Sequence, residues 1–142
     1  MDIRQTNTTA LAYLGDAVYE VYVRESSVRE KAANIDAIHR MNVRYVRAEG
    51  QEVAIRALLP ELTQEEQSVV RRARNHKITS KPKNANPITY KMATAFEALI
   101  GYLYLTDQKE RMEEIIRKAM EIIDESGSGK PRVARNPAGQ EK

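Results

Sequence analysis

Several residue types and patterns are missing from this sequence, and each absence excludes a class of protein. Cysteine is absent, so disulfides and thiolate metal sites are excluded, and a reducing cytoplasmic location is expected. No apolar run approaches the ~20 residues that span a bilayer. The longest, residues 96–105, is shorter and contains Glu97 and Gly101. The polar first seven residues do not resemble a signal peptide, and neither a strand pattern of useful length nor an internal repeat is present.

The length and composition that remain fit one small domain. The chain has 142 residues, of which 42% are hydrophobic, enough to fill one core. We expect an all-α domain over residues 1–125. Residues 126–142 are rich in Gly, Pro and basic side chains, and we expect them to form a flexible basic tail.

Negative charge is missing from one long segment. Residues 67–96 contain no Asp or Glu but carry seven of the basic residues, and because the whole chain nets +3, the remainder nets −4. A segregated basic segment on an otherwise acidic chain indicates a polyanionic partner. The alternative is a solvated loop that happens to be basic. The seven residues are Arg71, Arg72, Arg74, Lys77, Lys81, Lys83 and Lys91.

Apolar periodicity and capping signals predict about six helices. The serine pair at positions 26 and 27 is expected to end the first helix, Pro60 the third, and the capping box that begins at Thr63 starts the fourth. Ile35, Ile38 and Val53 are expected to point inward. The expected helices cover residues 8–24, 28 or 34 to 41, 43–59, 63–74, 87–105 and 107–123, with a long basic loop at 75–87.

Two of these helices share an unusual composition. Each is apolar and carries one acid with a glycine nearby: Gly15 and Asp16 in the first, Glu97 and Gly101 in the fifth. Glycine is costly inside a helix, so its presence in both suggests a close helix crossing. Such a crossing would bring Asp16 and Glu97 together.

Two facing carboxylates repel unless a proton or a cation lies between them. Mg²⁺ suits such a site because it binds one or two carboxylates, keeps several waters and takes a substrate phosphate. The alternative is that each acid caps a helix or pairs with a nearby arginine.

The same residues resemble a known family. Leu14-Gly-Asp-Ala-Val18 is similar to the signature helix of ribonuclease III, and Phe96-Glu-Ala-Leu-Ile-Gly101 is similar to that fold's second catalytic motif. The basic run Arg71–Lys77, the following Pro82-Lys-Asn84, and the lack of a double-stranded-RNA-binding domain resemble Mini-ribonuclease III, the stand-alone catalytic-domain branch. The resemblance covers roughly residues 8–123.

The resemblance implies an all-α homodimer that cleaves double-stranded RNA with Mg²⁺, for which Mn²⁺ can substitute, in maturation of precursor large-subunit (23S) ribosomal RNA. It implies that Asp16 and Glu97 are the catalytic metal ligands and that Tyr13 packs across the dimer interface. Water would attack the scissile phosphorus in line and leave 5′-phosphate and 3′-hydroxyl ends. The expected RNA contacts are Arg71, Arg72, Arg74, Asn75, Lys77, Lys81, Lys83 and Lys91.

The sequence departs from the longer family members at two acids. Ala12 stands where they have a glutamate, and Thr94 where they have an aspartate, so two of four site carboxylates remain. Glu20, one turn after Asp16, is expected to join the metal through water, although an ordinary surface charge is the competing interpretation.

Two other functions compete with an endoribonuclease. The missing carboxylates favour a catalytically inactive ribonuclease III-like RNA-binding module that acts in ribosome assembly, whereas retention of Asp16 and Glu97 argues against it. An all-α nucleotide pyrophosphohydrolase would need several acids on paired helices, and no such cluster lies on an apolar face here.

Overall fold

The computed structural model describes residues 3–30, 34–77 and 83–127, and all of its regular structure is helical. The predicted all-α class with six helices is therefore confirmed. Two short 3₁₀ segments, η1 (Ile3–Gln5) and η2 (Leu59–Glu61), accompany the helices. The helices are α1 (Thr8–Arg29), α2 (Ile35–Val46), α3 (Ala48–Leu58), α4 (Gln64–Asn75), α5 (Pro87–Leu105) and α6 (Lys109–Ser126).

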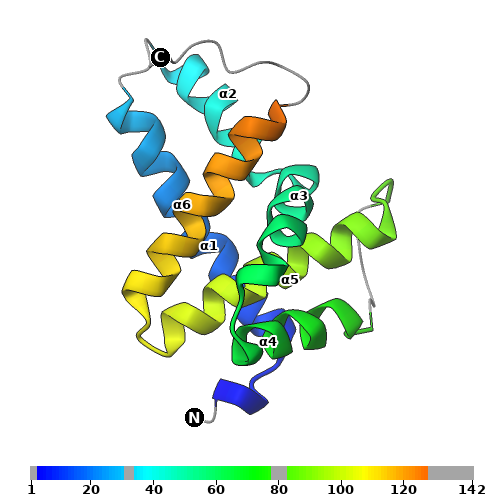
Figure 1. The fold of residues 1–142 in the computed structure, drawn as a ribbon. Helices are drawn as coiled ribbons and strands as arrows, with labels where there is room; N and C mark the ends of the chain where they lie inside the picture. The colour runs from blue at the N-terminus through cyan, green and yellow to red at the C-terminus, as the bar shows by residue number, and fades with distance from the viewer. Residues whose placement is uncertain (1–2, 31–33, 78–82, 128–142) are drawn as a thin grey trace.

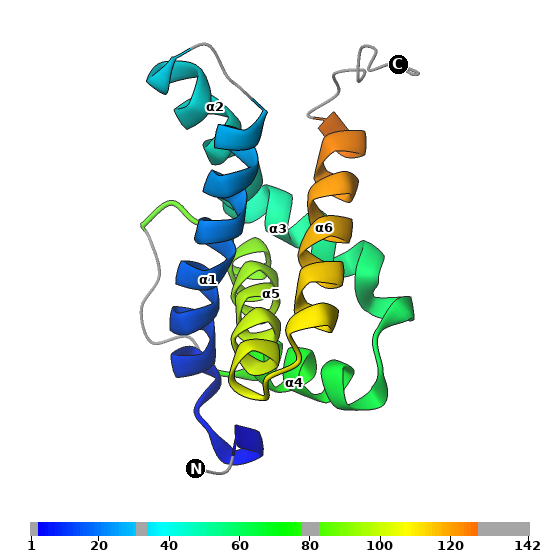
Figure 2. The same cartoon turned by 90° about the vertical axis from the view of Figure 1, so that its left-hand side faces the viewer.

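Helix α5 is the central element of the fold. It packs most extensively against α1, and also against α3, α4 and α6 (Figures 1 and 2). Ten of its residues are buried, among them Phe96, whose ring packs edge-to-face with the Tyr19 ring of α1 at 5.0 Å between centroids. A helix covered on several sides is expected to be apolar almost all round. The acid Glu97 therefore lies on the most buried helix of the domain.

The crossing of α1 and α5 depends on its two glycines. A Cβ placed on Gly15 would lie 1.8 Å from the Glu97 carbonyl oxygen, and one on Gly101 would lie 2.0 Å from the Leu11 carbonyl oxygen. No side chain fits at such distances, so the two backbones touch directly. The predicted close helix crossing is what the structure contains.

Several helix boundaries follow their capping signals. Asn7 accepts from Thr9 N at 2.7 Å at the start of α1, and Asn86 accepts from Ile88 N at 2.9 Å at the start of α5. Thr63 and Glu66 form the predicted capping box. Pro87 occupies the first turn of α5, where its missing N–H costs nothing.

Other boundary predictions were wrong. Helix α1 continues through both serines to Arg29, because Ser27 is buried and donates its hydroxyl to Val23 O at 3.1 Å within the helix. The break predicted near residue 42 lies instead at Arg47, where the backbone is extended. There Gln51 Nε2 donates to Val46 O at 3.2 Å and satisfies a carbonyl at the end of α2.

The predicted inward positions of Ile35 and Val53 were also wrong, since these side chains are 73% and 40% exposed. Only the C-terminal half of α2 enters the core, through Asn42 and Tyr45. Lys81 and residues 128–142, which include most of the predicted basic tail, lie outside the described residues. Within the described part of the chain, no helix has the length and hydropathy to cross a membrane.

The glycine contact gives a stability prediction. Gly15→Ala gains helix propensity, but its methyl group would force α1 and α5 apart, so we expect a loss of at least about 3 kcal/mol in the free energy of unfolding, the upper range for overpacking. Urea denaturation measures it. Ala17→Gly, at an exposed site on the same helix, is the control and should cost about 1 kcal/mol. A Gly15→Ala protein as stable as the wild type would contradict the contact.

Candidate active site

The two acids face one another because their helices touch at Gly15. Asp16 follows that glycine on α1, and the backbone oxygen that Gly15 contacts belongs to Glu97 itself. The side chains of Asp16 and Glu97 are within hydrogen-bonding reach of each other. The structure thus brings together the two residues that the sequence separates by eighty positions.

The pair is electrostatically unfavourable as two anions. Burial, and after it the charge and hydrogen bond of Asp16, together raise the pKa of Glu97 to about 8. The Glu20 carboxylate also contributes to the raised pKa. Near neutral pH, without a cation, Glu97 therefore holds a proton.

Two amides lie next to these acids, and the sequence analysis missed both. Gln51 of α3 is 1% exposed and hydrogen-bonds Glu97, which lowers the pKa of that carboxyl against the larger raising effects. Asn42 of α2 is also buried and donates from Nδ2 to Glu20 Oε2 at 2.8 Å. No local sequence signal marks either amide, because α2 and α3 also carry charged side chains such as Arg44 and Glu52.

Glu20 occupies the next turn of α1 after Asp16. It is not a free surface charge, because Asn42 and the Arg24 guanidinium, at 3.2 Å, both donate to it. Its negative charge is one of the causes that raise the pKa of Glu97. Glu20 thus lies within electrostatic range of the acid pair, which keeps its predicted role through water open.

The donor set fits a hydrated divalent cation. Two carboxylates that are forced together and retain a proton are the arrangement that a hard cation relieves. Among the described residues, no group of three or more His, Cys, Asp or Glu side chains forms a ready-made metal cage. A cation held here would keep most of its waters, as Mg²⁺ does in sites with one or two carboxylates.

The predicted RNA-binding side chains lie mainly on α4 and on both sides of the loop before α5. Arg71, Arg74, Asn75, Lys77 and Lys83 are exposed, whereas Lys91 is half-buried. Arg72 turns toward the N-terminal segment and donates to Thr6 O at 3.5 Å. Within the described residues, no basic side chain of this group forms an ion pair with an acid.

Several other arginines behave differently. Arg24, Arg29, Arg44, Arg56 and Arg111 each pair with a carboxylate, at 2.7–3.2 Å. The described basic side chains between Arg71 and Lys91 differ from these in having no acidic partner in the described structure, which leaves their charge available to a polyanion.

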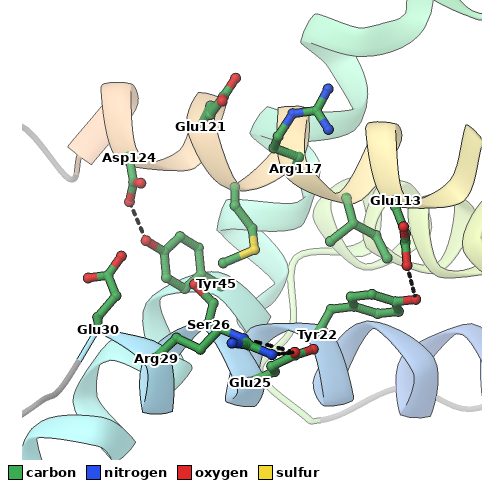
Figure 3. A pocket seen from close by; sticks show the side chains of 12 residues that line it. Tyr22, Glu25, Ser26, Arg29, Glu30, Tyr45, Glu113, Arg117, Glu121 and Asp124 are labelled. Atoms are coloured by element: carbon green, nitrogen blue, oxygen red, sulfur yellow. Dashed lines mark hydrogen bonds and ion pairs between the residues drawn. The ribbon is translucent and has the colours of Figure 1, made fainter. Parts of the chain in front are cut away.

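A groove between α1 and α6 has the opposite charge (Figure 3). Its apolar floor includes Ile116 and Met120. Tyr22 donates to Glu113 at 2.7 Å and Tyr45 donates to Asp124 at 2.5 Å along its walls. Five carboxylates and only two arginines line it, so a phosphate backbone would be repelled there. The carboxylates are Glu25, Glu30, Glu113, Glu121 and Asp124.

The raised pKa of Glu97 predicts a pH dependence of stability. The folded protein holds this proton up to about pH 8, whereas the unfolded chain releases it near 4.5. The stabilisation that comes from this bound proton is therefore complete below the unfolded-state pKa of 4.5, and it is lost as the pH rises through the folded-state pKa of about 8. In EDTA, the free energy of unfolding should fall by at most about 1.4 kcal/mol per pH unit between pH 5 and 8.

Urea unfolding of the wild type and of Glu97→Gln at pH 6 and pH 8 tests this. The variant cannot bind the proton, so it should lose less stability over the interval. Equal pH dependence in both proteins would show that Glu97 has an ordinary pKa.

Comparison with known proteins agrees with this geometry. The ribonuclease III domain model matches residues 9–108. A Mini-ribonuclease 3 from Symbiobacterium thermophilum is 46% identical over 114 residues, covering 80% of this chain and 88% of the relative. One from Enterococcus faecalis is 43% identical over 127 residues, covering 88% and 96%.

A crystal structure of a protein from Fusobacterium nucleatum superposes with a TM-score of 0.75 at 31% identity, covering 84% of this chain and 96% of that one. Divalent metal ions are general to the family whose domain model matches, which agrees with the fit of the carboxylate pair. From the matched domain and these relatives, we conclude that the chain belongs to the ribonuclease III family, is similar over most of its length to the Mini-ribonucleases 3, and is an endoribonuclease.

Proposed function

We propose that this endoribonuclease cleaves double-stranded RNA with Mg²⁺, leaving 5′-phosphate and 3′-hydroxyl ends. The observation that carries the proposal is the contact between the half-buried Glu97 and the exposed Asp16, in which Glu97 retains a proton while no cation is present. A structural role alone would not require two acids in contact on two apolar helices, because such a pair is unfavourable without a counter-charge.

The roles of the residues follow from this placement. Asp16 and Glu97 would hold the ion, Mg²⁺ or Mn²⁺, and Glu20 would meet its waters. A bound divalent ion supplies stabilisation of charge on the phosphoryl group and activation of water for attack. Gln51 keeps the Glu97 carboxylate in place by a hydrogen bond and leaves its charge unneutralised.

Removing either acid should abolish cleavage without unfolding the domain. We expect Asp16→Asn and Glu97→Gln each to lower cleavage of a duplex RNA in Mg²⁺ by more than about a hundredfold, since loss of residues that merely support metal ligands already costs about 10–100-fold. Cleavage rates, with circular dichroism to check the fold, measure this. Glu121→Gln, in the α1–α6 groove, is the matched control and should cleave normally. An Asp16→Asn protein with full activity would overturn the assignment.

The unpaired basic side chains support binding to the RNA backbone. Arg71 and Arg74 lie three residues apart and exposed on α4, with Lys77 just beyond its end. We propose that these residues, with Arg72, Asn75, Lys81, Lys83 and Lys91, contact phosphates and 2′-hydroxyls. Double-stranded RNA is recognised mostly in this way, by the shape of its wide minor groove.

Salt dependence tests this surface. Arg71→Ala/Arg74→Ala should weaken duplex RNA binding and reduce the slope of log K against log salt by about one for each lost phosphate contact. The binding is measured in the Asp16→Asn background, so that no RNA is cut. Lys109→Ala/Arg117→Ala removes two exposed charges from α6 and should leave the slope unchanged. Equal slopes in both double variants would place the RNA elsewhere.

We also propose that the protein forms a homodimer. Its two active sites, one in each subunit, would then cut the two strands of a duplex. The support for the dimer is a row of exposed apolar side chains on α1: Tyr13 is 85% exposed, Val21 62% and Val28 63%. Such a row on one helix marks an interaction surface. Sedimentation of the purified protein tests it, and a monomer at micromolar concentration would contradict it.

The same proposal includes a cytoplasmic location and precursor 23S ribosomal RNA as the natural duplex, which the family resemblance implies. Mapping of 23S RNA ends in cells that lack the protein tests the substrate, and mature ends would contradict it. The competing interpretation from the sequence, a catalytically inactive RNA-binding module, predicts binding without cleavage. One gel separates the two, because only the enzyme cuts duplex RNA in Mg²⁺ and stops in EDTA.

A further inference from the structure

Asn42 is an unusual buried residue. Its side chain comes from α2 and is 93% buried, yet only half of its amide is satisfied. Nδ2 donates to Glu20 Oε2 at 2.8 Å, whereas Oδ1 is buried and has no partner among the described residues. An unpaired buried acceptor is costly and rare in native proteins, so a leucine of similar size would suit the packing better. Stability therefore does not explain why an amide stands at this position.

The partner of Asn42 lies beside the acid pair. Glu20 is four residues after Asp16 on α1, which places the two on the same side of the helix. Its charge is one of the causes of the raised pKa of Glu97. The carboxyl group of Glu20 is thus the third acidic group near the site.

All hydrogen bonds to Glu20 converge on one oxygen. Asn42 Nδ2, Arg24 Nε and Arg24 Nη2 all donate to Oε2, at 2.8, 3.2 and 3.2 Å. Within the described residues, Oε1 has no hydrogen-bond partner. Arg24 is largely exposed, with 69% of its side chain accessible, so Asn42 is the buried and better fixed donor. The arrangement holds the carboxylate at one oxygen and leaves the other oxygen free to accept.

We propose that Asn42 is a positioning residue that holds Glu20 beside Asp16 and Glu97, so that Glu20 Oε1 accepts hydrogen bonds from the waters of a hydrated divalent cation. This inference rests on the proposed metal-dependent function. A neutral amide suits the task because it orients the carboxylate without neutralising it. A lysine or arginine buried at this position would instead compete with the cation for the charge of Glu20.

The proposal predicts that stability and metal binding respond in opposite directions. Asn42→Leu removes the unpaired acceptor together with the donor, so its urea midpoint should equal or exceed that of the wild type. Its affinity for Mg²⁺, measured by calorimetry on the free protein, should fall by about 10–100-fold, as for other residues that orient metal ligands. The kcat for duplex RNA at a fixed, subsaturating Mg²⁺ concentration should fall with it, while the KM for RNA stays unchanged.

Two further variants make the test specific. If Asn42 acts through Glu20, then Glu20→Gln should lose Mg²⁺ affinity to a similar extent, and the double variant should lose no more than either single variant. Ser27→Ala is the matched control, because Ser27 is equally buried on α1 but bonds only Val23 O. It should leave Mg²⁺ affinity unchanged.

The outcomes separate this inference from the proposed function. An Asn42→Leu protein that is destabilised but binds Mg²⁺ normally would show a purely structural role and overturn the inference. Additive losses in the double variant would overturn it as well. Wild-type protein that binds Mg²⁺ but fails to cut duplex RNA would instead contradict the proposed function, since the calorimetric comparison does not depend on cleavage.

Discussion

The contact between two backbones at Gly15 and Gly101 is the constraint on which the site depends. Because the Glu97 carbonyl fills the space where a side chain of residue 15 would stand, α1 and α5 cannot be further apart or slide along each other without losing it. The acids that flank this contact are then forced together. Helix packing thus brings the two acids together.

Because the two acids are held close together, their charges repel, and the described residues around them offer no buried positive charge to neutralise them. Glu97 takes up a proton, Gln51 and Asn42 contribute neutral hydrogen-bond donors, and Arg24, on the same helix as Asp16, is exposed and pairs with Glu20. No buried arginine or lysine among the described residues pairs with Asp16 or Glu97. Elsewhere the chain does use such pairs, as between Arg111 and the buried Glu66 at 2.9 Å. Because Asp16 and Glu97 have no such basic partner in the described part of the chain, their negative charge is available to a bound cation.

The sequence predicted those features that depend on local signals. Pro87 fixed the predicted start of α5, and two glycines in two apolar helices were enough to predict the crossing and hence the pairing of Asp16 with Glu97. The prediction failed at positions whose burial depends on residues far away in the sequence. Ser27 ends a helix by propensity, but here the core buries it, and Ile35 is apolar but lies on the part of α2 that the core does not reach.

Asn42 and Gln51 could not be predicted for the same reason, since their partners are on another helix and their own neighbours in sequence give no sign of them. The positions of Asp16 and Glu97 follow from the motifs, whereas the residues that hold the surrounding charges follow only from the packing of α2 and α3. A single sequence therefore identifies the centre of this site but not its support.

The division of the basic residues into paired and unpaired groups has a consequence for how the protein can change. The arginines that pair with acids join helices to one another or stabilise single turns, whereas the described basic side chains between Arg71 and Lys91 contribute no ion pair to the described structure. If the proposed RNA surface is correct, binding of a polyanion and cohesion of the domain depend on separate sets of charges. Substitutions at exposed positions of α4, such as Arg71 and Arg74, would then change RNA affinity and its salt dependence without a matching change in the free energy of unfolding.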